Sequence, residues 1–240
     1  MHRTCRAWWV PLVAIGLVAV GCGSSSPAPD EVRSARELAD SLLVAKDLEG
    51  KWTLNAVPDG VDLSSAGVID DTNRDKLPQI EVCDKASQTS RDAINAIEWG
   101  AFRQIDKTVD DPIKPPKDRE GHMVFVQEWL ASGDADELEA IFGDVETAFI
   151  ECLGDIPAGE EGPGTITNVD IEPIGDQRIA ALARFEEAGG AGTWNIYSVF
   201  VRYGTVLMGM TAVDIVLGDL PAELVLGDLD SILSTALSRI

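Results

Sequence analysis

The chain offers few side chains for hydrolytic chemistry. A serine or cysteine nucleophile normally needs an adjacent base, and His122 is the only histidine after residue 2. His122 opens a stretch that is typical of a β-strand, and the sequence contains no Gly-x-Ser-x-Gly elbow. The simplest interpretation of His122 is a residue at the edge of a strand. We therefore expect no catalytic residue, and we predict that the protein is not an enzyme.

Metal and phosphate chemistry are also poorly supported. Residues 71–75 place acidic and amide side chains at the first three ligand positions of a calcium loop. Lys76 then replaces the turn glycine, and Val82 stands where the bidentate carboxylate belongs. The glycine-rich stretch 189–192 leads from one predicted strand into another, whereas a phosphate loop opens a helix. We expect neither a metal ion nor a cofactor.

Cys22 has the most clearly predicted chemistry. It follows an apolar run, Trp8 to Val20, that is shorter than the roughly 20 residues needed to span a bilayer. Two arginines precede this run and small residues close it, as in a cleaved export signal. With its cysteine directly after Gly21, the stretch resembles a bacterial lipobox, in which that cysteine carries the lipid. We predict a signal peptide over 1–21, lipidation at Cys22 and a flexible tether over 22–33. The alternative is an ordinary signal peptide with a chance cysteine.

The remaining cysteines are predicted to form a disulfide. Outside the cytoplasm, cysteine pairing is the default, and Cys83 and Cys152 are left once Cys5 and Cys22 are assigned to the signal and the lipid. No Cys-x-x-Cys motif favours metal binding instead. Closing so long a loop would stabilise the fold by roughly 4 kcal/mol on the chain-entropy model.

The composition limits the partners. The 240 residues include 41 acidic and 19 basic side chains, a formal net charge of −22. This balance repels phosphates, so we expect no nucleic-acid partner and no charge-driven docking on anionic lipids. Membrane contact would then come from the N-terminal lipid, on the extracytoplasmic face. The apolar content of 45% is sufficient for a core, and we expect one domain over 34–240.

The hydrophobic pattern predicts an α+β fold. Apolar residues at helical spacing indicate helices after Ser34, between Asp134 and Gly154, and from Pro221 to the C-terminus. Alternating or β-branched stretches predict strands over 52–57, 94–105, 122–130, 165–174, 178–186, 193–203 and 206–214. Residues 58–92 and 157–164 are typical of loops. The short links between the last strands favour hairpins, so we expect a single antiparallel sheet of six to seven strands with helices packed on it.

The last two strands are apolar on both faces. A sheet with one solvated face alternates between apolar and polar residues, and residues 194–213 do not. A partial cover would leave a groove for a small ligand, lined by Trp194 and Tyr197, with Arg184 and Arg202 as donors to an anionic group. The alternative is that both faces are fully covered and the arginines pair with nearby glutamates.

The order helix, strands, helix, strands, helix carries a resemblance to a known family. With Leu42-Leu43 near its start, Cys83, Cys152 and the closing hairpin, residues 34–240 resemble the PknH-type extracellular sensor domain of actinobacterial kinases and envelope lipoproteins. The resemblance implies one antiparallel sheet, helices packed against it and a ligand-binding cleft. The kinase sensor has two disulfides where this chain can form one, and no binding residue of the family transfers to this sequence.

These observations predict a lipid-anchored, extracytoplasmic domain that binds a small ligand or an envelope protein without transforming it. Two alternatives stay open: a structural or partner-binding module of an envelope complex, and a hydrolase that uses two carboxylates alone. A cleft with two facing carboxylates would favour the hydrolase. A groove of ligand size would favour the sensor, and a flat apolar patch the partner-binding module.

Overall fold

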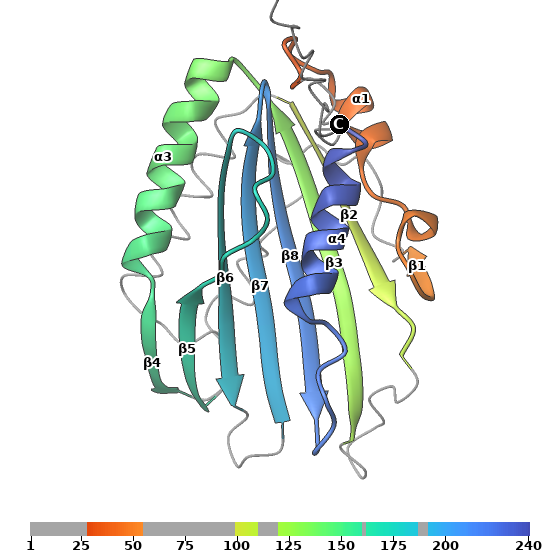
Figure 1. Cartoon of the computed structure of the whole chain (residues 1–240), viewed down its shortest axis with the longest axis vertical. Coiled ribbons are helices and arrows are strands. Elements are labelled where there is room, and N and C mark those ends of the chain that lie inside the picture. Colours follow the sequence, from red (N-terminus) through yellow and green to blue (C-terminus); the bar gives the residue numbers. More distant parts are fainter. Residues whose placement is uncertain (1–27, 55–98, 110–119, 160–161, 187–191) are drawn as a thin grey trace, which may run out of the picture.

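The computed structural model describes residues 28–54, 99–109, 120–159, 162–186 and 192–240. Within these ranges the chain forms one antiparallel sheet, with strand order β1-β2-β3-β8-β7-β6-β5-β4 (Figure 1). The strands are β1 (Trp52–Leu54), β2 (Trp99–Lys107), β3 (Gly121–Ser132), β4 (Gly154–Gly159), β5 (Gly162–Asn168), β6 (Gln177–Glu186), β7 (Gly192–Tyr203) and β8 (Val206–Leu217). The helices are α1 (Ala35–Ser41), α3 (Ala135–Glu151) and α4 (Leu226–Leu237), with one 3-10 turn, η1 (Ala45–Asp47).

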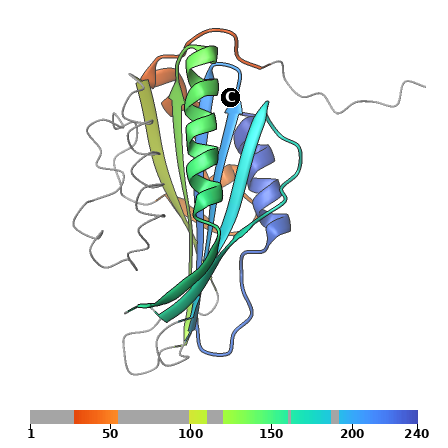
Figure 2. The same ribbon diagram turned by 90° about the vertical axis from the view of Figure 1, so that its left-hand side faces the viewer.

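Helices lie on both sides of this sheet, with α3 on one side and α4 on the other (Figure 2). We call the two sides the α3 face and the α4 face. The core of the α4 face combines residues of α1, α4 and the central strands, among them Leu38, Leu130, Val199, Met208 and Leu229. The smaller core of the α3 face is made of Phe102, Trp129, Ala131, Leu138, Phe142, Ile179 and Leu207. One antiparallel sheet with helices packed on both of its apolar faces confirms the expected α+β class.

The predicted starts of the first two helices are confirmed. The Ser34 hydroxyl and the Glu37 carboxylate form a reciprocal capping box at α1. The Asp134 carboxylate accepts hydrogen bonds from the N–H groups of Asp136 and Glu137, at 3.0 and 3.4 Å, at the start of α3. Both caps involve neighbours in the sequence, which is why local patterns predict them.

The third helix begins later than expected, at Leu226 rather than near Pro221. The segment before it is held against the sheet by Asp214, a fully buried residue of β8. Its carboxylate oxygen Oδ2 accepts hydrogen bonds from the N–H groups of Glu223 and Leu224, at 2.8 and 3.0 Å. These two hydrogen bonds fix the segment before Leu226 to β8, and this segment is not helical.

The sheet has eight strands, which corrects the expected six to seven. The additional strand is β4, which pairs with β5 across part of the range 157–164 that glycine and proline signals assign to a loop. β4 lies at the edge of the sheet and its register shifts between Ile156 and Gly159. Proline is tolerated in edge strands, so pairing with β5 outweighs the local turn signals.

The described part of the predicted tether, residues 28–33, contacts the domain instead of hanging free. The carbonyl oxygen of Pro29 accepts a hydrogen bond from the Thr205 N–H at 3.0 Å, and the Arg33 N–H donates to the Ser132 hydroxyl at 2.9 Å. The Arg33 guanidinium also donates to the carbonyl of Ile240. Residues 1–27, with the predicted signal peptide and Cys22, lie outside the described residues. Within the described ranges, no helix has the length and apolarity needed to cross a membrane.

Candidate functional site

The predicted groove residues on the final strands are divided between the two faces of the sheet. Side chains two residues apart in a strand point to the same face. Asn195 therefore shares the α4 face with the core residue Tyr197. Arg184 pairs with Asn195 across β6 and β7, so it lies on the α4 face too. Trp194 and Arg202 alternate with Tyr197 along β7, so they lie on the α3 face. Because Arg184 and Arg202 lie on opposite faces, they cannot donate to one ligand. The predicted two-arginine site is therefore wrong.

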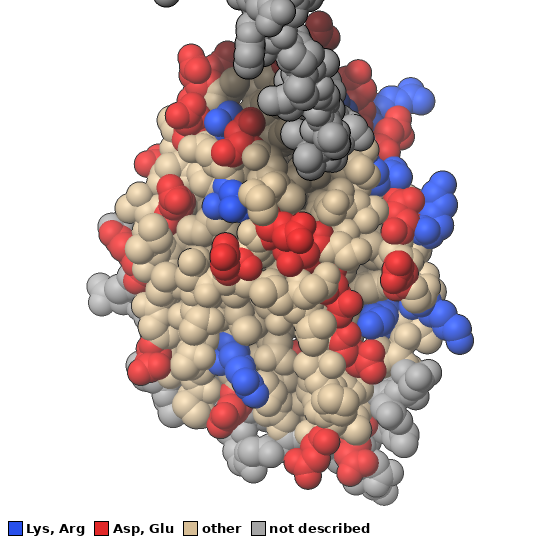
Figure 3. All heavy atoms as spheres, viewed as in Figure 1, with Lys and Arg blue, Asp and Glu red and all other residues tan. Residues whose placement is uncertain are grey.

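The partners of these residues explain their roles. The Arg202 guanidinium lies 3.6 Å from Asp176 and 3.9 Å from Glu139, and it donates to Gln177 at 2.6 Å. Pairing with nearby acids, the alternative interpretation, therefore holds for Arg202. Tyr197 is a core residue at 8% exposure, and burial, followed by the nearby Asp214 and Asp228, raises its pKa. Arg184 is exposed, and Figure 3 shows the basic side chains of the α4 face scattered among acidic ones.

Trp194 lies in an apolar row on the α3 face. Adjacent strands place Met123, Ile215, Trp194 and Phe185 side by side, and we call these four residues the Trp194 row. None of them belongs to the two cores of the described residues, and Met123 is 47% exposed. The α3 core covers the other end of the face, where the Phe200 ring packs edge-on against Trp129 and Phe149. Counting only the described residues, the cover of this face is thus partial.

A pocket of about 350 Å³ opens between α3 and the edge of β6. Its apolar lining is Ile150 from the last turn of α3, Leu153 just after α3, Val169 and Ile171 from the segment after β5, and Ile179 and Ala180 from β6. Its polar lining is Glu146, Asn168, Asp170 and Arg178. Ile150 is 57% exposed at this site. No sequence pattern predicts a site at these residues.

The pocket exists because β5 ends before β6 does. The last backbone contact joins the Val169 N–H to the Ala180 carbonyl at 2.9 Å. The chain then crosses to the α4 face, where Ile171 is buried in the core. Arg178 lies where the two strands have separated, and its Nε donates to the carbonyl of Ile171 at 3.4 Å. This separation leaves a gap that α3 closes from the other side.

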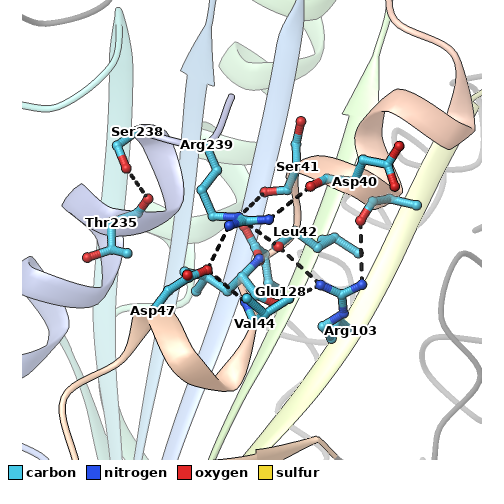
Figure 4. A network of polar contacts seen from close by, with 12 residues as sticks. Asp40, Ser41, Leu42, Val44, Asp47, Arg103, Glu128, Thr235, Ser238 and Arg239 are labelled. Atoms are coloured by element: carbon cyan, nitrogen blue, oxygen red, sulfur yellow. Dashed lines mark hydrogen bonds and ion pairs between the residues drawn. The ribbon is translucent and has the colours of Figure 1, made fainter.

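A network of polar contacts holds residues 40–44, the end of α1 and the turn after it, which we call the turn 40–44 (Figure 4). The Arg239 guanidinium of the C-terminus donates to the carbonyls of Asp40, Ser41 and Leu42 at 2.9 to 3.1 Å, and it pairs with Asp47 at 2.8 Å. From β2, Arg103 donates to the carbonyls of Leu42 and Leu43 at 3.1 and 2.8 Å. The carbonyls at the end of a helix lack partners within it, and the two guanidinium groups supply them.

Glu128 lies beneath this turn. Glu128 is only 1% exposed, and its Oε2 accepts a hydrogen bond from the Leu43 N–H at 2.6 Å. The other oxygen, Oε1, has no hydrogen-bond partner. Burial raises the pKa of Glu128 from 4.5 to about 7, although the Leu43 N–H and the guanidinium groups of Arg103 and Arg239 act in the opposite direction. A sequence signal did exist, because Glu128 occupies an apolar-face position in the stretch 122–130.

His122 and Asp214 form a second buried polar pair on the α4 face. Nδ1 of His122 lies 3.7 Å from Oδ1 of Asp214, and neither atom has a hydrogen-bond partner. His122 is 4% exposed, in an interior strand of the sheet. His122 is the second residue of β3, so its expected place at the end of a strand is confirmed, and its side chain is buried there.

Several other predicted residues can be placed only in part. Cys152 follows α3 directly and is disulfide-bonded. Its bonding partner is not among the described residues, so the pairing with Cys83 stays a prediction. The calcium-like stretch 71–75 and residues 189–191 of the glycine-rich stretch also lie outside these ranges. Among the residues that the structure describes, no group of three or more His, Cys, Asp or Glu is placed to hold a metal ion.

Comparisons with known proteins give distant structural likenesses. No protein-family model matches the chain, and no curated protein matches it. The extracellular domain of PknH from Mycobacterium tuberculosis is similar with a TM-score of 0.46 and 13% identity, covering 88% of this chain and 98% of that domain. A Mycobacterium smegmatis protein, the Rv0999 ortholog, is similar with a TM-score of 0.31 and 11% identity, covering 64% of this chain and 73% of its own.

Proposed function

We propose that this protein is a lipid-anchored, extracytoplasmic binding domain that takes a small ligand in the pocket between α3 and β6. The pocket carries the proposal. Its volume of about 350 Å³ is at the lower end of the range of small-molecule sites, roughly 300 to 1,000 Å³. Its lining combines an apolar wall with a few polar groups, as such sites do.

The lining indicates an amphiphilic ligand. Ile150, Leu153 and Ile179 offer contact to an apolar body. Arg178 offers a planar donor group that suits a carboxylate or phosphate. Because Glu146 and Asp170 also line the pocket, a head group of high negative charge would be repelled. A singly charged or zwitterionic head group fits this set best.

Binding can be tested with 1-anilinonaphthalene-8-sulfonate, an apolar probe with one negative charge. We expect Arg178→Ala to weaken probe binding, measured by fluorescence titration, by about tenfold, the loss of one charge-assisted contact. The matched control is Arg184→Ala, an exposed arginine on the same face of the same strand outside the pocket. Equal affinities of both variants and the wild type would contradict the proposed site.

Anchoring rests on the sequence around Cys22 and has its own test. Mass spectrometry of the membrane-extracted protein should show a diacylglyceryl-modified N-terminal cysteine, and Cys22→Ala should release the protein from the membrane fraction. A mature form with an unmodified Cys22 would contradict it. Mapping of non-reduced peptides checks the Cys83–Cys152 pairing in the same sample.

A partner-binding module is the second candidate, favoured by the Trp194 row. This row is apolar, and Met123 within it is 47% exposed. If the row is the functional surface, Met123→Lys should abolish co-purification of an envelope protein and leave probe binding unchanged. The carboxylate-only hydrolase is less well supported. Its general acid needs a raised pKa, and among the described carboxyls the one raised to about 7 belongs to Glu128, which is buried away from the pocket.

A further inference from the structure

Glu128 is a carboxyl enclosed by elements that carry charges of both signs. Arg103 lies opposite Glu128 across the β2–β3 ladder, and Met210 lies opposite it on β8. Asp47 of η1 and Arg239 beyond α4 also act on its charge. One oxygen is bonded to the Leu43 N–H, and the other has no hydrogen-bond partner. A buried carboxylate oxygen without a donor is costly, because water would otherwise hydrate it.

The cover over this carboxyl is the turn 40–44. Leu42 and Leu43 are completely buried and belong to the core of the α4 face. The bonds of Arg239 described above go to the carbonyls of this turn and to Asp47. The cover is therefore held by polar contacts as well as by its leucines. Water can reach Glu128 from this side when the turn moves away.

We propose that Glu128 is a proton-operated latch on the turn 40–44: the neutral carboxyl lets the turn lie closed on the sheet, and ionisation favours its opening. An opened turn admits water to Oε1, which has no donor in the closed state. The turn belongs to the segment through which the chain enters the domain, next to residues 28–33. The latch would thus couple external pH to how firmly that segment is held, which goes beyond ligand binding.

The direction of the pH effect follows from the raised pKa. Burial raises the pKa of Glu128 from 4.5 to about 7, so between these values the closed state binds a proton that the open state has lost. Closure is most stable below pH 4.5 and weakens as pH rises through about 7. For one proton, the opening equilibrium should rise by about tenfold per pH unit within this window and become level above it.

The test is hydrogen exchange of the backbone amides in the full chain between pH 5 and 8, corrected for intrinsic rates. In the wild type, the protection of the Leu43 amide should fall by up to tenfold per pH unit towards pH 7. Glu128→Gln, which keeps the shape and removes the titration, should make this protection independent of pH. The matched control is Glu49→Gln, an exposed position that should retain the wild-type slope.

Two results would overturn the latch: wild-type protection that does not change with pH, or the same slope in Glu128→Gln. Because the glutamine amide could itself disturb the fold, a second measurement uses the wild type alone. Carbon-13 NMR of the side-chain carboxyls should show one glutamate with a midpoint near pH 7. If all glutamate carboxyls titrate below pH 5, the latch does not exist.

Discussion

The two faces of the sheet are covered in different ways. On the α4 face the cover includes two segments with irregular backbone, residues 40–44 at the end of α1 and the segment before α4, and a buried acidic side chain accepts backbone N–H bonds from each. Glu128 serves the first and Asp214 the second. In the described part of the chain, the α3 face is covered by one long helix, whose backbone is satisfied internally, and aromatic packing holds it.

This difference has a physical reason. Irregular backbone that is buried must find partners for its N–H groups, and a buried carboxylate can supply them. A helix needs no such partner except at its ends. Among the residues that the structure describes, the buried ionisable side chains Arg103, His122, Glu128 and Asp214 all lie on the α4 face. The α3 face, with fewer covering elements, leaves room for the pocket and the Trp194 row.

The largest effect should come from Gly209 on the α3 face. A Cβ atom at this position would lie 1.9 Å from the Trp129 indole, which crosses β8 there. Gly209→Ala should lower the free energy of unfolding by about 3 kcal/mol or more, at the upper end of overpacking costs, as measured by urea denaturation.

The control for this change is Gly143→Ala in α3, where a Cβ would meet no atom within 4 Å. This variant should gain about 0.5 to 1 kcal/mol, because alanine favours the helix. A Gly209→Ala protein as stable as the wild type would show that the indole does not pack across the strand.

Truncation of one isoleucine on each face tests how complete the covers are. Ile232 of α4 is 6% exposed within the core, and Ile232→Ala should cost about 2 to 5 kcal/mol. Ile196 faces the open end of the α3 face and is only half-buried, so Ile196→Ala should cost about 1 kcal/mol. Equal losses in urea denaturation would mean that the α3 face is as well covered as the α4 face.

Polar contacts should matter more on the α4 face than surface charges do. Arg239→Met removes the donors to three carbonyls and the pair with Asp47, and we expect a loss of about 1 to 3 kcal/mol. Arg184→Met, at an exposed position, should change stability by no more than about 0.5 kcal/mol. Thermal melts of both variants at one pH check the difference, and similar melting temperatures would argue against the network.

The smallest effect concerns Glu37, whose pH dependence should be opposite to that of Glu128. Its hydrogen bond with the Ser34 side chain lowers the pKa of this exposed carboxyl, so its contribution is present above the ordinary pKa of 4.5 and is lost as pH falls. Glu37→Gln should remove this loss of stability in acid. Melting temperatures from pH 3 to 7 measure this effect. If Glu37→Gln and the wild type lose the same stability as the pH falls, the lowered pKa of Glu37 does not contribute to stability.

The sequence alone determined the features that depend on near neighbours. The cap at Asp134, the apolar stripe of α3 and the capping box at Ser34 each involve residues within a few positions, and each was found where the pattern predicted it. The antiparallel pairing of β6, β7 and β8 also follows, because their links are too short for any other connection.

Tertiary structure decided the rest, because it depends on which strand lies beside which and in what register. Period-two alternation shows that Trp194 and Arg202 share a face, but the β6–β7 register puts Arg184 on the other one. The strand β4 forms against its own turn signals because β5 lies beside it. Glu128 is a charged residue within an apolar stripe, and only the fold places the Leu43 N–H above it. Local chemistry fixes the starts of α1 and α3, whereas buried ionisable groups acquire their partners from distant parts of the chain.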